Sequence, residues 1–165
     1  MSAPKPGASG GVSPPMALGF AVVGFLALVI AGFGMASLLL DADVIAVSGL
    51  GQLPGVIAVA AATAAFGGVL WAAVRVENPV YRASVAVTVA AFAASLLGLW
   101  IGALAAGVDL ARATAAVGGF ATSWFAVILA VAAFVAAWCG IALVRTRAAR
   151  PRWPWERDED DPAGR

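Results

Sequence analysis

The side chains with the clearest capacity for chemistry lie near the end of the chain, in the stretch "RTRAARPRWPWERDEDD". Guanidinium groups bind phosphate and carboxylate oxygens, and indole rings either rest at the headgroup level of a membrane or fill pockets on a protein surface. This combination predicts a contact site for lipid or for a protein partner, made by Arg145, Arg147, Arg150, Arg152, Trp153 and Trp155.

Two interpretations of this basic, aromatic and acidic tail stay open. In the first, the arginines stop a membrane helix, the two tryptophans anchor the chain at the surface, and the acids keep its end in solution. In the second, Trp153 and Trp155 form a docking segment for a membrane or cytosolic protein, because the neighbouring Pro151 and Pro154 restrict the backbone around them.

The groups on which most enzymes rely are missing from the sequence. Histidine is absent, and the single cysteine, Cys139, lies in an apolar run where we expect a small buried hydrophobe. A disulfide within the chain and a metal site built on His or Cys ligands are therefore excluded. All nine acidic residues fall outside the long apolar runs, which leaves no carboxylate there for proton transfer. The sequence predicts no catalytic, cofactor-binding or metal-ligating residue, and it favours a protein that is not an enzyme.

The polar residues within the apolar runs carry hydroxyl groups. A helical Ser or Thr can donate to a carbonyl of the preceding turn, and this is the role we expect; hydroxyls that line a substrate path are the alternative. The residues concerned are Ser37, Thr63, Ser84, Thr88, Ser95, Thr122 and Ser123.

Small and aromatic residues predict how the helices pack. Gly98 and Gly102 are four residues apart, a spacing that lets helix backbones approach closely in lipid. We expect this pair to pack within the bundle, with an oligomer seam as the alternative. Trp100 and Trp124 lie at similar distances from the connection "VDLARAT", so a hairpin would bring them to the same depth. Core packing is the favoured role for these two tryptophans, ahead of an aromatic ligand cage.

The elements that carry these residues are four long apolar runs. The chain is 62% hydrophobic and 12% charged, whereas a soluble domain is about half apolar and a quarter charged. Some 20 helical residues reach about 30 Å, the thickness of the hydrocarbon core. We predict an all-α, antiparallel up-down bundle of four transmembrane helices over residues 17–144, with spans at about 17–40, 55–74, 83–107 and 117–144. A flexible tail, 1–16, precedes it, and the tail 145–165 follows it.

The distribution of basic residues predicts the orientation. In a model with four spans, one side holds Lys5, Arg75, Arg82 and the tail arginines, whereas the other side holds three aspartates and only Arg112. Basic residues in short loops favour the cytoplasm. Both termini are therefore expected on the cytoplasmic side.

The Ala-, Val-, Gly- and Arg-rich spans followed by "RPRWPWERDEDD" resemble small, uncharacterised four-helix integral membrane proteins of high-GC actinobacteria. The resemblance implies a bacterial plasma (inner) membrane location and carries over no site residue. Two functions stay open. One is an accessory or scaffold protein that acts through helix packing and its tail, with a membrane or cytosolic protein as partner; the other is a small transporter or channel that works as a homo-oligomer. Neither involves a cofactor or a nucleic acid.

Overall fold

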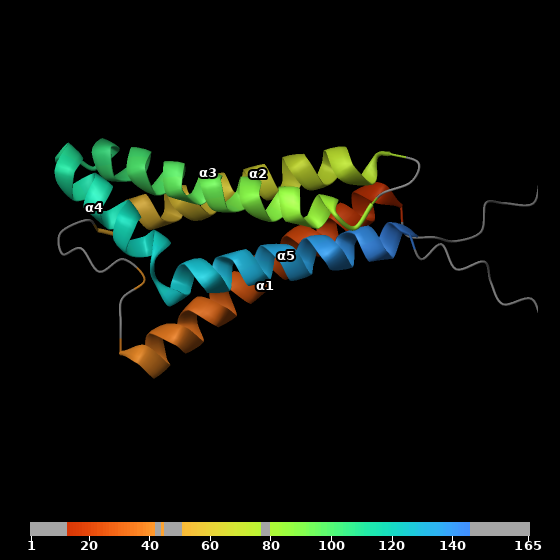
Figure 1. Ribbon diagram of the computed structural model, residues 1–165, viewed down its shortest axis with the longest axis horizontal. Helices are drawn as coiled ribbons and strands as arrows, with labels where there is room; N and C mark the ends of the chain where they lie inside the picture. Colours follow the sequence, from red (N-terminus) through yellow and green to blue (C-terminus); the bar gives the residue numbers. More distant parts are fainter. Residues whose placement is uncertain (1–12, 42–43, 45–50, 77–79, 146–165) are drawn as a thin grey trace, which may run out of the picture.

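The computed structural model describes residues 13–41, 44, 51–76 and 80–145. Within these residues the secondary structure is helical, and Figure 1 shows the arrangement of the helices. The prediction of an all-α bundle with four helices long and apolar enough to cross a membrane is confirmed, with one short helix added. The five helices are α1 (Pro14–Leu40), α2 (Leu53–Val74), α3 (Ala83–Ala105), α4 (Leu110–Ala121) and α5 (Trp124–Arg145).

Local sequence sets several of the helix ends. Prolines occupy the first positions of α1 and α2, where the missing N–H costs no hydrogen bond. At the end of α3, Gly107 adopts a φ of 80°, and its N–H donates to the carbonyl of Leu104 while that of Val108 donates to Ala103. This is a Schellman motif, and glycine suits its left-handed position because it has no Cβ. The third helix therefore ends at Ala105, two residues before the predicted limit.

The predicted fourth span, 117–144, differs from the structure. Residues 110–121 form the separate helix α4, and α5 begins at Trp124. Gly118 and Gly119 weaken the helix here, and the hydroxyls of Thr122 and Ser123 donate to backbone carbonyls of residues 118–120. These two features account for the break, which falls a few residues after the two glycines.

The helices pack as antiparallel neighbours around one main core. A Cβ added to Gly102, late in α3, would meet Pro54 at the start of α2, and one added to Gly140, late in α5, would meet Ala21, early in α1. At the centre of the bundle, the fully buried rings of Phe25 and Phe66 stack with their centroids 4.6 Å apart. The core therefore joins α1 and α2, and α5 contributes further buried residues to it.

The helices form two pairs, α1 with α5 and α2 with α3. The two pairs lie close together at one end of the bundle and diverge at the other, where α4 links α3 to α5 (Figure 1). A second small core, formed by Ala103, Ala113 and Ala116, packs α4 against α3. The ring of Phe33 in α1 meets Phe120 of α4 and Phe125 of α5 edge-on, at 6.4 and 5.5 Å. These ring contacts fasten the α4–α5 corner to α1.

The outer faces of the long helices are apolar. Large side chains recur every four or eight residues along the exposed face of α3, at Val85, Val89, Leu97 and Ile101. Soluble monomers rarely expose contiguous apolar surface on this scale, and a bilayer would cover it. The exposed faces therefore agree with the span lengths in assigning the long helices to a membrane.

Candidate functional site: the basic, aromatic end of the bundle

Three arginines mark one end of the bundle. Arg75 caps the end of α2, Arg82 precedes α3, and Arg145 is the last residue of α5. The ends of α2 and α5 and the starts of α1 and α3 lie together at this end (Figure 1). These three arginines thus lie at the ends of the long helices and not within them, as the sequence predicts.

An aromatic stack holds Arg145 at this end. The guanidinium carbon of Arg145 lies 4.7 Å from the centroid of the Tyr81 ring, and the Tyr81 ring stacks on that of Trp138 with 5.6 Å between centroids. Tyr81 precedes α3, whereas Trp138 and Arg145 lie two turns apart on α5. The stack therefore fastens the start of α3 to the root of the C-terminal tail.

A second cation–aromatic pair lies at the same end. The guanidinium carbon of Arg75 is 5.5 Å from the centroid of the Trp71 ring, one turn earlier in α2. Contacts of this kind contribute about 0.5–1 kcal/mol at exposed sites and more where water is excluded. The sequence alone did not indicate the role of Tyr81, because that role depends on α3 packing beside α5.

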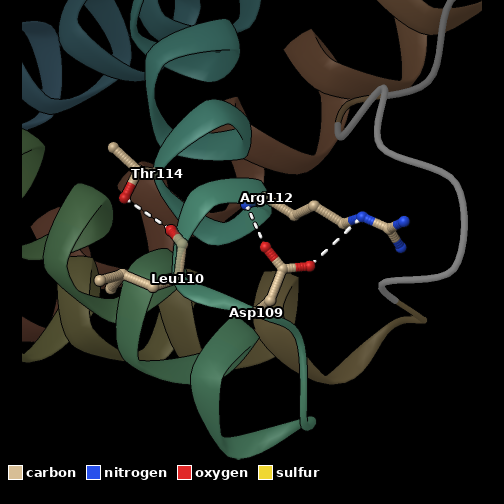
Figure 2. A network of polar contacts seen from close by, with 4 residues as sticks. All are labelled: Asp109, Leu110, Arg112 and Thr114. Carbon is tan, nitrogen blue, oxygen red and sulfur yellow. Dashed lines mark hydrogen bonds and ion pairs between the residues drawn. The ribbon is translucent and has the colours of Figure 1, made fainter.

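The opposite end carries a different polar group, shown in Figure 2. Asp109 caps α4: its carboxylate accepts the N–H of Arg112 at 3.0 Å, and its other oxygen lies 3.3 Å from Nε of the same arginine. The Thr114 hydroxyl donates to the carbonyl of Leu110 at 2.8 Å. Both side chains of the ion pair are mostly exposed, so its expected role is to start α4, with only a small effect on stability.

Trp100 and Trp124, expected at the same depth and in the core, have different surroundings. The indole N–H of Trp100 lies 3.4 Å from the Thr114 hydroxyl, and its ring packs against the small core between α3 and α4. Trp124 opens α5 with 67% of its surface exposed and lies outside both cores. The expectation assumed a simple hairpin, whereas α4 occupies the space beside Trp100.

Gly98 and Gly102 lie in the seam between α3 and α2. A Cβ on Gly98 would come within 2.9 Å of the Cα of Ala58, and one on Gly102 within 2.8 Å of the Cα of Pro54. Both glycines are buried. The structure therefore places this pair in packing within the chain, and their common face is not free to form a seam between copies.

Six of the hydroxyl groups make the hydrogen bonds that the sequence predicts. Those of Thr63, Ser84, Thr88, Ser95, Thr122 and Ser123 each donate to a carbonyl three or four residues earlier. Among the described residues, no buried side-chain nitrogen or oxygen lacks a hydrogen-bond partner. The hydroxyl donors are thus satisfied by backbone carbonyls close to them in the chain.

Two other predictions concern individual positions. Cys139 was expected to be buried, but it is exposed on α5 because the neighbouring helices cover the adjacent faces instead. Arg147, Arg150, Arg152, Trp153 and Trp155 lie outside the described residues. In the part of the chain that the structure describes, no group of three or more His, Cys, Asp or Glu residues is placed to hold a metal ion.

Four apolar spans with charges at their ends define a small multi-pass membrane protein. The chain belongs to a family of unknown function, DUF6121, whose model matches residues 16–163. This match includes nearly the whole helical region and nearly all of the C-terminal tail. No curated protein and no solved structure matches the chain.

Proposed function

We propose that this protein is a non-enzymatic accessory or scaffold component of a bacterial plasma membrane, which acts through helix packing and its C-terminal tail. The observation that carries the proposal is the separation between an inert bundle and a chemically distinctive tail. In the described spans, the hydroxyls of Thr63, Thr88 and Ser95 donate to carbonyls of their own helix, and the arginines lie at the helix ends. The family model continues to residue 163, so the tail is part of what defines the family.

The root of the tail supports the same proposal. Arg145 is fastened to Tyr81, and through Tyr81 to Trp138, so the tail leaves the bundle from a fixed point. A fixed exit point reduces the entropy lost when a following segment binds a partner. No specific observation favours the homo-oligomeric transporter or channel, since the Gly98 and Gly102 seam is already filled by α2.

The proposal includes both termini in the cytoplasm. Reporter fusions after Asp43 and after Arg112 are expected to report the outside, and fusions after Arg82 and Arg165 the cytoplasm, because the short basic segments favour the cytoplasmic side. A cytoplasmic signal at Arg112 together with an outside signal at Arg82 would reverse the orientation and remove the tail from the proposed compartment.

The tail itself is tested by replacing Trp153 and Trp155 with Ala and measuring what co-purifies from native membranes. Release of a partner that accompanies the unmodified chain is expected, because a buried Trp at an interface often contributes about 2 kcal/mol or more, roughly thirtyfold in Kd. Insertion and abundance should not change, since the spans are untouched.

The matched control is Trp124→Ala, which removes an exposed tryptophan from the other end of the bundle. This variant should keep the partner. Equal co-purification by the tail variant and the unmodified chain would reduce the tail to a lipid anchor and defeat the docking role.

A further inference from the structure

The contact that Arg145 makes with Tyr81 is a cation–aromatic contact and not a hydrogen bond. The guanidinium carbon lies 4.7 Å from the centroid of the Tyr81 ring, and a guanidinium group over a ring keeps N–H donors at its edge for other partners. Within the described part of the chain, the ion pair between Asp109 and Arg112 at the opposite end is the one salt bridge found. Arg145 is exposed and therefore offers a positioned set of donors without a carboxylate from these residues.

An apolar stripe runs from Arg145 along the outer face of α5. Steps of seven residues connect Arg145 to Trp138, Val131 and Trp124, and the last three are 47%, 55% and 67% exposed. Because seven residues are close to two helical turns, these side chains share one face. Phe134 and Val135 widen the stripe beside Trp138. A positioned cation therefore stands at the end of an uncovered apolar surface about 30 Å long.

We infer that the Arg145–Tyr81–Trp138 stack and the stripe below it bind one anionic phospholipid. The phosphodiester oxygens would accept hydrogen bonds from the edge of Arg145, Trp138 would lie at the level of the glycerol backbone, and an acyl chain would follow Phe134, Val135 and Val131. The inference does not depend on a protein partner for the tail, since it uses described residues of the bundle alone.

Charge and shape favour this ligand over two related ones. Arg75 and Arg82 lie at the same end, so a zwitterionic headgroup would bring its own cation towards three guanidinium groups. An anionic headgroup brings no such cation. A free phosphate would satisfy Arg145 but would leave the adjacent apolar stripe uncovered, whereas a phospholipid uses both.

The test uses the full-length protein in mild detergent and native mass spectrometry. Dioleoyl-phosphatidylglycerol and dioleoyl-phosphatidylcholine are added at equal concentration, so that only the headgroup differs. The unmodified chain should retain the first lipid about tenfold better, and Arg145→Gln should lose most of this preference, the size expected for one charge-assisted pair.

Variants of Tyr81 separate a built site from general surface charge. Tyr81→Leu keeps every charge but removes the ring under Arg145, and it should reduce the preference severalfold, whereas Tyr81→Phe keeps the ring and should bind like the unmodified chain. Arg112→Gln is the charge-matched control at the other end and should change nothing. Circular dichroism of each variant checks that the helices are retained.

Four results would overturn the inference. Unchanged lipid preference in Arg145→Gln would remove Arg145 from the site. An equal loss in Arg112→Gln would reduce the effect to net charge. Unchanged preference in a folded Tyr81→Leu variant would remove the stack from the site. Displacement of the lipid by millimolar inorganic phosphate would assign the arginine to a free anion.

Discussion

Replacing Phe25 with Ala is expected to lower the free energy of unfolding by about 3–5 kcal/mol, measured by denaturant titration in a mild detergent. The Phe25 side chain is fully buried and stacks face to face on Phe66 at the contact between α1 and α2. Truncation removes both its buried area and the stacking contact, and the surrounding helices can close the cavity only in part.

Phe20→Ala provides the matched control in the same helix. The Phe20 side chain is 65% exposed, so its removal creates no cavity, and a change within about 0.5 kcal/mol is expected. Equal losses for the two variants would mean that Phe25 does not lie in a packed core and would contradict the arrangement of α1 and α2.

Replacing both Gly98 and Gly102 with Ala is expected to destabilise the bundle by about 3 kcal/mol or more in the same assay. Each added methyl would lie within 3.0 Å of a Cα atom of α2, and a backbone atom cannot move aside as a flexible side chain can. The two helices would therefore have to separate along the seam that joins them most closely.

Gly68→Ala should instead raise the free energy of unfolding. A Cβ at Gly68 meets nothing within 4 Å, and Ala favours a helix over Gly by about 0.5–1 kcal/mol. A stabilised or unchanged Gly98 and Gly102 variant, with a normal helical spectrum, would show that α2 and α3 are further apart than described.

The long helices could be predicted from the sequence because each is set by a local property, a run of apolar residues close to the thickness of a bilayer. Helix α4 escaped this reasoning, since its residues continue the apolar run of α5 and a few polar groups near residue 122 produce the break. Helices α1 and α2 begin three and two residues earlier than expected, because Pro14 and Pro54 are compatible with a first helical turn.

Packing within the bundle was predicted less completely. The spacing of Gly98 and Gly102 correctly indicated a close helix contact inside the chain, but spacing alone does not name α2 as the partner. The contact of Arg145 with Tyr81 joins residues far apart in the chain and depends on α3 packing beside α5. Counting residues from a loop also could not show the different surroundings of Trp100 and Trp124, because α4 lies between them in the chain.

The mass of the complex released from native membranes by gentle detergent extraction tests the central claim most directly. If the protein is an accessory or scaffold component, the released particle should contain one or more other proteins in a fixed ratio to this chain. A particle that contains only this chain, as a defined homo-oligomer in bound lipid, would contradict that claim and favour the transporter or channel.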